Sequence, residues 1–156
     1  MGALRARPLE ARDLDAVAAI ERAVFSDPWS RRSFVELLDL DSVRGFVADD
    51  GRGGVAGYAV CSLAADEAEI LNLATAPELR RQGVGRILLG AVLDWLAGRG
   101  AARVYLEVRR SNVAAIQLYA GAGFGTLGAR RDYYRKPTED AVTMGLDLGS
   151  RSAEKR

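Results

Sequence analysis

The fold is decided by residues 69–98, which read EILNLATAPELRRQGVGRILLGAVLDWLAG. The apolar start of this stretch predicts a strand at residues 69–74, and leucines and valines at helical spacing predict a helix at residues 85–99. A basic loop with glycines joins them. A helix start exposes unpaired amides, and glycines let an anion approach the backbone closely. The sequence therefore predicts an anion site made of Arg81, Gln82, Gly83, Val84, Gly85 and Arg86.

Two other phosphate-binding loops do not match this stretch. A nucleotide P-loop needs Gly-Lys-Ser/Thr at the start of the helix, and a dinucleotide fingerprint needs a third glycine where Leu88 stands. The alternative to an anion site is a basic turn in which the glycines only permit a tight backbone geometry.

The rest of the chain predicts strands and helices in a mixed order. Ser33 followed by Glu36 matches a capping box for a short second helix. The predicted strands lie at residues 4–9, 43–49, 55–63, 104–108, 125–133 and 141–148, and the other predicted helices at 13–25 and 112–122. This order indicates an α/β (mixed α+β) fold with helices on the faces of one sheet. We expect a single domain at residues 1–148 and a disordered tail at 149–156.

Composition excludes several kinds of chemistry. The 156 residues include no histidine and one cysteine, Cys61, so imidazole catalysis, an internal disulfide and a thiolate-cluster metal site are excluded. The net charge of +1 gives no reason to expect direct binding to nucleic acid or to a membrane surface. No apolar run approaches a membrane span and the first residues lack a secretory h-region, so we expect a cytoplasmic protein.

Several motifs together resemble one enzyme family. They are Leu71-Asn72-Leu73-Ala74, Arg80-x-x-Gly83-x-Gly85, Leu106-Glu107-Val108-Arg109, Ser111-Asn112, Leu118-Tyr119, Gly123-Phe124, Arg131-Asp132-Tyr133-Tyr134 and Pro28-Trp29-Ser30. The combination is similar to the GNAT N-acetyltransferases, in particular to the branch that acetylates the N-terminal alanine of ribosomal proteins. It covers nearly the whole chain.

The resemblance implies a GNAT fold, whose twisted and mostly antiparallel sheet is splayed at the acyl-CoA site. It implies acetyl-CoA as co-substrate and no metal. The acyl-CoA would contact the loop and helix start described above and also Leu73, Ala74, Thr75, Asn112 and Tyr119. The implied partner is a protein N-terminus, that of a ribosomal protein, and the enzyme would be a monomer or a weak dimer.

The resemblance also assigns two catalytic roles. Glu107 would be the general base that accepts the amine proton, directly or through water, and Tyr119 the general acid that protonates the departing sulfur. From the residues alone, Glu107 has the alternative of an ion pair with Arg109 or a neighbouring strand, and Tyr119 that of core packing. Glu69, expected on one strand face with Leu71 and Leu73, is the competing base.

Three aromatic residues have two interpretations. Trp29, Tyr133 and Tyr134 line a peptide groove in one and pack as ordinary core or surface residues in the other. Two other functions also stay open. One is acetylation of a small-molecule amine or a lysine, and the other, from a different class, is a non-catalytic module that binds acyl-CoA.

Overall fold

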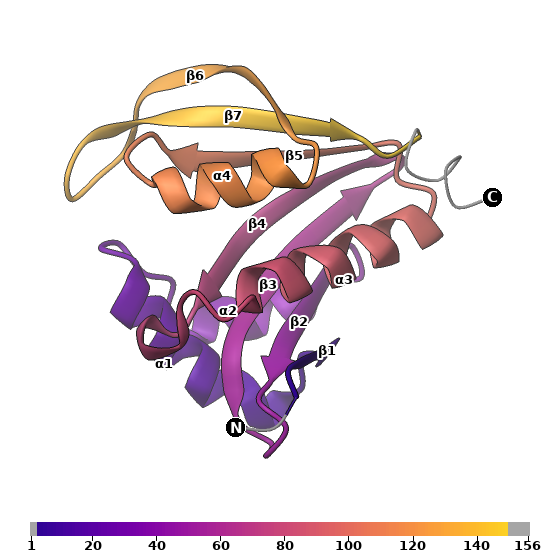
Figure 1. Ribbon diagram of the computed structural model, residues 1–156, viewed down its shortest axis with the longest axis vertical. Helices are drawn as coiled ribbons and strands as arrows, with labels where there is room; N and C mark the ends of the chain where they lie inside the picture. Colours follow the sequence, from indigo (N-terminus) through magenta and orange to yellow (C-terminus); the bar gives the residue numbers. More distant parts are fainter. Residues whose placement is uncertain (1–2, 150–156) are drawn as a thin grey trace.

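The computed structural model describes residues 3–149, in which seven strands form one sheet (Figure 1). The strands are β1 (Arg5–Pro8), β2 (Val43–Asp49), β3 (Val55–Ala64), β4 (Glu67–Thr75), β5 (Arg103–Arg109), β6 (Gly125–Tyr134) and β7 (Glu139–Asp147). Their order in the sheet is β1-β2-β3-β4-β5-β7-β6, and only the β4–β5 pair is parallel. The expected mixed, mostly antiparallel sheet is therefore confirmed.

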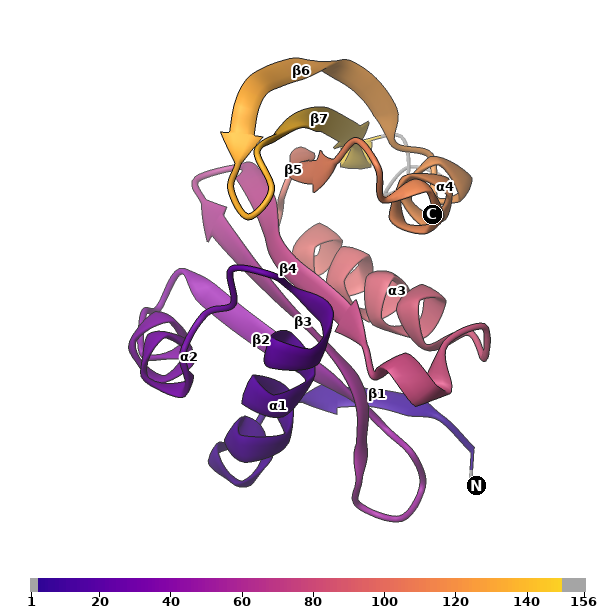
Figure 2. The same cartoon turned by 90° about the vertical axis from the view of Figure 1, so that its left-hand side faces the viewer.

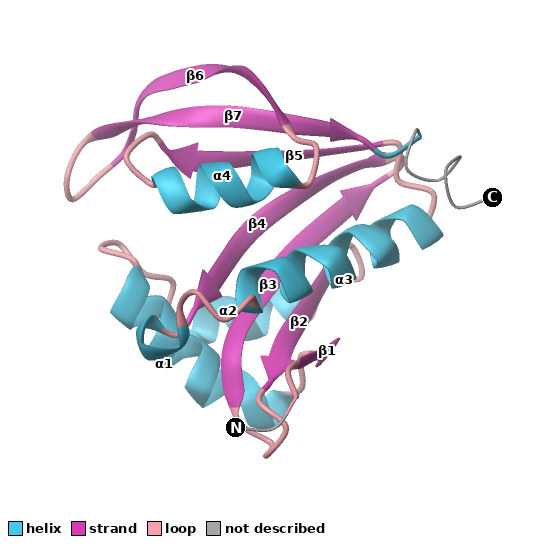
Figure 3. Ribbon diagram, in the orientation of Figure 1, coloured by secondary structure: helices cyan, strands magenta, loops and turns pink. Residues whose placement is uncertain are grey.

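The helices cover both faces of this sheet. They are α1 (Leu14–Val24), α2 (Arg31–Leu38), α3 (Val84–Gly98) and α4 (Val113–Gly121), with short 3-10 turns at Ala11–Asp13 and Pro77–Leu79. Helices α1 and α2 lie on one face, and α3 and α4 on the other (Figures 2 and 3). None of the helices within residues 3–149 is long and apolar enough to cross a bilayer.

Two apolar clusters hold the layers together, one on each face. On the α3 face, Leu88, Val92 and Leu96 are fully buried against side chains of the sheet, including Leu106 of β5. On the α1 face, the cluster is built around Val17, Phe34 and other buried residues of α1, α2 and the sheet. Burial of a large apolar side chain contributes about 1.5–3 kcal/mol, so these clusters fix the two layers against the sheet.

The start of α2 differs from the prediction. The helix begins at Arg31, and its cap is Ser30, whose Oγ accepts a hydrogen bond from the Ser33 amide at 3.1 Å. The capping box assigned to Ser33 and Glu36 is therefore wrong by one turn. The physical reason is that Ser30 has extended backbone angles and follows the break at Pro28, so the helix can begin three residues earlier.

Strand β4 is irregular at the position that matters for the site. Its register against β3 slips so that Cys61 pairs with Ile70 and Val60 with Asn72, which leaves Leu71 as an extra residue. A bulge of this kind turns the following side chains to the other face. Leu71 packs with the α1 cluster and Leu73 with the α3 cluster, so the expectation that Glu69, Leu71 and Leu73 share one face is wrong at Leu73.

Strands β4 and β5 are paired over only part of their length. The parallel ladder runs from the Glu67–Arg103 pair to the Ile70–Leu106 pair and then ends. Beyond it the two strands diverge, toward the left in Figure 1. The splay expected from the resemblance is therefore present, and one edge of β4 beyond Ile70 is unpaired by β5. Of the predicted tail, residues 150–156 lie outside the described residues.

Candidate active site

Glu107 is the first residue of β5 beyond the last pair with β4. Val104, Leu106 and Val108 are buried in the cluster under α3, so the alternation of a strand turns Glu107 toward the α1 face. Its side chain is 14% exposed. The Thr143 hydroxyl donates to Oε2 at 2.7 Å, and Nε of Arg130 lies 2.8 Å from Oε1.

Glu107 is therefore a partly buried carboxylate at the point where strands β4 and β5 separate. The alternative that it pairs with Arg109 is wrong, because Arg109 pairs with Glu139 at 3.1 Å. The alternative of an ion pair with a neighbouring strand is wrong as well, because the cationic partner is Arg130 on β6, which β7 separates from β5 in the sheet. That arginine is 62% exposed, and an ion pair with so exposed a partner holds the carboxylate only weakly.

The carboxylate of Glu69, the competing base, interacts electrostatically with the carboxylate of Glu107. Partial desolvation and the Glu107 carboxylate raise the pKa of Glu69 above its ordinary value, and Arg130 opposes the shift. The two carboxylates therefore share one region on the α1 face of the sheet.

Tyr119 projects from α4 into the cluster on the opposite face. It is 6% exposed, and its ring packs edge-on against Phe124 with 5.7 Å between centroids. The packing interpretation of Tyr119 is therefore confirmed. Its hydroxyl makes no hydrogen bond within residues 3–149. Burial first, and Tyr134 second, raise the pKa of Tyr119, which keeps the phenol protonated at neutral pH.

Tyr134, at the end of β6, interacts electrostatically with both candidate catalytic residues. Desolvation raises the pKa of Tyr134 to about 12, with contributions from Tyr133 and Glu107, and Tyr134 in turn raises the pKa of Tyr119. Its ring stacks under the guanidinium of Arg109, with 4.6 Å from Cζ to the ring centroid. Sequence reasoning left Tyr134 undecided, and in the structure it packs against Arg109 and interacts electrostatically with Glu107 and Tyr119.

The start of α3 has the features of the predicted anion site. Gly83 adopts the left-handed region, with φ +82°, and a Cβ there would meet no atom within 4 Å. Its carbonyl accepts the first helical bond, from Ile87 at 3.1 Å. Val84 is buried, so it offers only its backbone, whereas Arg81, Gln82, Gly83 and Arg86 are exposed.

Two further groups border this helix start. Gly85 lies against α4, where an added Cβ would be 3.0 Å from the Leu118 side chain, so the glycine lets α3 and α4 approach closely. Asn112 caps α4, as predicted, with Oδ1 accepting from the Ala115 amide at 3.2 Å. The capping role of Asn112 is confirmed, and its contact with a co-substrate stays a prediction.

Leu73, Ala74 and Thr75 occupy the unpaired edge of β4. On their other side they pair with β3, through Ala59, Tyr58 and Gly57. The end of the β4–β5 ladder thus leaves this edge of β4 unpaired by β5, and Glu107 is the first residue of β5 beyond that end. An amide-rich helix start and an unpaired strand edge fit the diphosphate and the pantetheine arm of an acyl-CoA.

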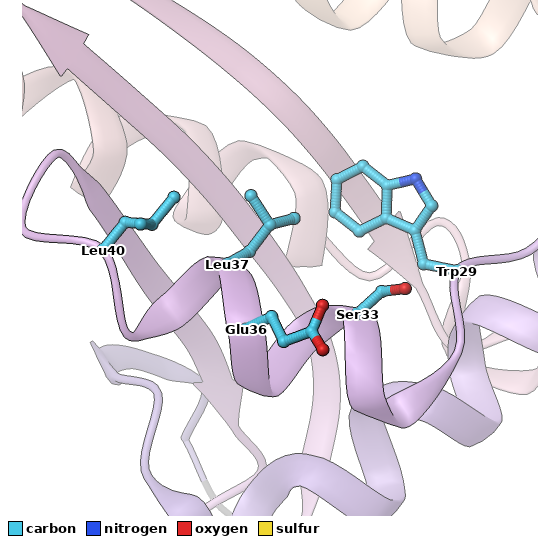
Figure 4. Close-up of a pocket in the computed structure, with 5 residues that line it drawn as sticks. All are labelled: Trp29, Ser33, Glu36, Leu37 and Leu40. Carbon is cyan, nitrogen blue, oxygen red and sulfur yellow. The ribbon is translucent and has the colours of Figure 1, made fainter.

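A groove on the surface lies apart from these residues. An open groove of about 540 Å³ runs along α2, lined by Trp29, Ser33, Glu36, Leu37 and Leu40 (Figure 4). It contains none of the predicted catalytic or acyl-CoA residues. The Trp29 ring packs both in this groove and against Phe34, at 5.3 Å.

One buried acid was missed by sequence reasoning. Glu21 of α1 is 1% exposed and accepts hydrogen bonds from the Tyr58 hydroxyl, from Asn72 Nδ2 at 2.7 Å and from the Trp29 amide at 2.9 Å. Burial raises the pKa of Glu21. The available signal was its position four residues after Val17, on the apolar stripe of the helix.

Comparisons with known proteins agree with this geometry. The model of the acetyltransferase (GNAT) family matches residues 14–124. The [ribosomal protein bS18]-alanine N-acetyltransferase of Escherichia coli K12 is 39% identical over 144 residues, covering 90% of this chain and 95% of that protein. A putative [ribosomal protein bS18]-alanine N-acetyltransferase of Bacillus subtilis is 34% identical, covering 91% and 94%.

A solved structure gives the same result. The crystal structure of the ribosomal-protein-S18-alanine N-acetyltransferase from Escherichia coli superposes with a TM-score of 0.86 at 37% identity, over 94% of each chain. The family match covers more than half of the chain, and the sheet, its splay and the amide-rich helix start all agree with it. The chain thus belongs to the GNAT family and is an acetyl-CoA-dependent N-acetyltransferase.

Proposed function

We propose that the enzyme acetylates the α-amine of a protein N-terminus, namely the N-terminal alanine of ribosomal protein bS18. The names of its relatives in Escherichia coli and Bacillus subtilis support this acceptor. The observation that carries the proposal is the place of Glu107, at the first position where β5 leaves β4, beside the gap that leads to the start of α3.

In the proposed mechanism, acetyl-CoA supplies the thioester carbonyl carbon that the amine nitrogen attacks. Glu107 accepts the amine proton, directly or through one water, from the α1 face of the sheet. Tyr119 donates its phenolic proton to the sulfur as the carbon–sulfur bond breaks. The phenol is protonated at neutral pH, so it has a proton to donate when the thiolate leaves.

Two places on the protein would hold the co-substrate. The amides of Val84, Gly85 and Arg86 would bind its diphosphate, with Arg81 and Gln82 at the rim. The unpaired edge of β4 at Leu73, Ala74 and Thr75, together with Asn112 of α4, would bind the pantetheine arm and polarise the carbonyl.

The amine itself favours a chain terminus. An α-amine has a pKa near 8 and is partly neutral at neutral pH, whereas a lysine near 10.4 needs about 3–4 kcal/mol to lose its proton there. A single carboxylate in a partly exposed site is therefore better suited to deprotonating an α-amine than to deprotonating a lysine.

The test compares two matched peptides. One carries the N-terminal sequence of bS18 with a free α-amine, and the other has the same sequence blocked at that amine but keeps a free lysine. Mass spectrometry after incubation with acetyl-CoA should find acetylation of the first peptide only. Acetylation of the lysine alone, or of small amines but neither peptide, would overturn the proposed acceptor.

A further inference from the structure

The side chain of Arg109 donates four hydrogen bonds to other residues that the structure describes. It ends β5 on the same face as Glu107, two residues further along the strand. One terminal nitrogen, Nη2, donates to the Arg135 carbonyl at 2.6 Å and to the Ser26 hydroxyl at 3.3 Å. The other, Nη1, donates to the Pro137 carbonyl at 3.0 Å and to Glu139 at 3.1 Å.

These partners come from two loops that are far apart in the sequence. Ser26 belongs to the α1–α2 loop, residues 25–30, and the two carbonyls belong to the β6–β7 loop, residues 135–138. Figure 2 shows the tip of the β6–β7 hairpin reaching over the sheet toward the α1–α2 loop. The side chain of Arg109 thus lies where the two loops meet.

The surroundings of Arg109 keep its guanidinium in one orientation. The Tyr134 ring stacks on it, with 4.6 Å from Cζ to the centroid, and the Arg109 side chain is 21% exposed. Glu139 uses its second oxygen to accept from the Ser111 amide at 2.6 Å, which connects the cluster to the turn before α4. A planar guanidinium with five donors can serve these partners at once, and a lysine ammonium cannot.

The remaining contacts between the two loops are weaker. Asp27 lies 3.7 Å from Arg135 and 3.8 Å from Lys136, and both cations are more than two-thirds exposed. Exposed ion pairs of this length contribute little. Arg109 is therefore the main connection between the loops.

We propose that Arg109 is a positioning residue for the acceptor. It holds the α1–α2 and β6–β7 loops together over the Glu107 face of β5 and so sets the width of the path by which an amine reaches Glu107. The inference rests on the proposed function, because that function brings the acceptor to this face. In the proposed function the acyl-CoA binds at the start of α3 and the edge of β4, so we expect its binding not to depend on the loops.

The test compares Arg109→Met with Arg110→Met. Arg110 is the matched control, because it is the next residue, is 63% exposed and, among the described residues, forms an ion pair with Asp140 alone, at 3.9 Å. In Arg109→Met the KM for the bS18 peptide should rise about tenfold, the effect of losing roughly one hydrogen bond of a charged group. The kcat and the Kd for acetyl-CoA should stay within about threefold of the native values, and Arg110→Met should change none of the three.

A readout that does not use activity accompanies the kinetics. Amide hydrogen exchange should become faster in residues 25–30 and 135–138 of Arg109→Met and stay unchanged in Arg110→Met. Ser26→Ala, which removes one exposed hydroxyl, should raise the KM by a smaller factor, and in the Arg109→Met background it should add nothing. Ser26→Ala in the native background keeps the proposal testable if Arg109→Met does not fold, and an unchanged KM there would then overturn it.

Two results would overturn the inference. One is an unchanged KM and unchanged loop exchange in Arg109→Met, and the other is an equal change in the Kd for acetyl-CoA. Failure of the proposed function is distinguishable, because the native enzyme would then not acetylate the α-amine of the peptide at all.

Discussion

Replacing Glu107 by Gln separates catalysis from stability more sharply than any other single change. The structural loss is small, since the variant keeps an oxygen for the Thr143 hydroxyl and loses an ion pair whose arginine is 62% exposed. An ion pair of that kind is worth about 0.2–1 kcal/mol. Loss of a general base costs about 10²- to 10⁴-fold in rate, or about 3–5 kcal/mol of barrier. The effect on kcat should therefore exceed the effect on stability several-fold.

The pH dependence gives this prediction a second signature. The variant depends on amine that is already neutral, and below a pKa near 8 that fraction falls about tenfold for each pH unit. The deficit of Glu107→Gln should therefore be largest at low pH and shrink as pH rises. The Glu107 carboxylate also raises the pKa of Glu69, so its removal should lower the pKa of Glu69, measurable by NMR titration of the carboxyl carbon.

The matched control is Glu69→Gln, assayed by release of free CoA thiol with the bS18 peptide as acceptor. We expect it to keep most of the native rate, and the Kd for acetyl-CoA to be unchanged in both variants. Equal rates for native enzyme and Glu107→Gln across pH would refute the assignment of the base. A larger loss in Glu69→Gln would transfer the role to Glu69.

Three further changes probe other parts of the account. Tyr119→Phe should slow acetyl transfer about tenfold or more. It should leave the melting temperature nearly unchanged, because the ring packs on Phe124 and the hydroxyl makes no hydrogen bond within residues 3–149. Full activity would show that Tyr119 only packs in the core. Gly83→Val should raise the Kd for acetyl-CoA about tenfold, measured by calorimetry. The reason is that φ is +82° at Gly83, and this left-handed conformation costs a residue other than glycine about 1–2 kcal/mol. An unaltered Kd would refute the anion site. The pKa of Glu21 is raised in the folded state above its ordinary value of 4.5, so its contribution to the free energy of unfolding should fall as pH rises from about 4.5 through the folded pKa. Glu21→Gln should flatten that slope in denaturant titrations, and an unchanged slope would show that Glu21 is not its source.

Much of the fold could be predicted because burial leaves a strong pattern. Residues 43–49 were predicted as a strand with the observed bounds of β2, since nearly every side chain there is buried. Leucines and valines at helical spacing predict the helix at residues 85–99, and Leu88, Val92 and Leu96 in that stretch are fully buried in α3. The error at α2 arose because Ser30 and Ser33 both lie at plausible capping distances, and only the backbone angles decide between them.

The site was less accessible to sequence reasoning because it depends on how distant strands meet. The bulge at Leu71 is set by the register of β4 against β3, and no local pattern shows it. The place of Glu107 depends on where the ladder with β4 ends. Its partner Arg130 comes from a strand that is separated from β5 in the sheet by β7, so spacing along the chain could not identify it.

The most direct test of the central claim is a crystal structure of the protein with acetyl-CoA bound. We expect the diphosphate to accept hydrogen bonds from the amides of Val84, Gly85 and Arg86. We expect the thioester carbonyl to lie in the gap between β4 and β5, beside Glu107 and Tyr119. A ligand seated in the groove along α2, or one whose thioester lies away from the gap, would contradict that claim.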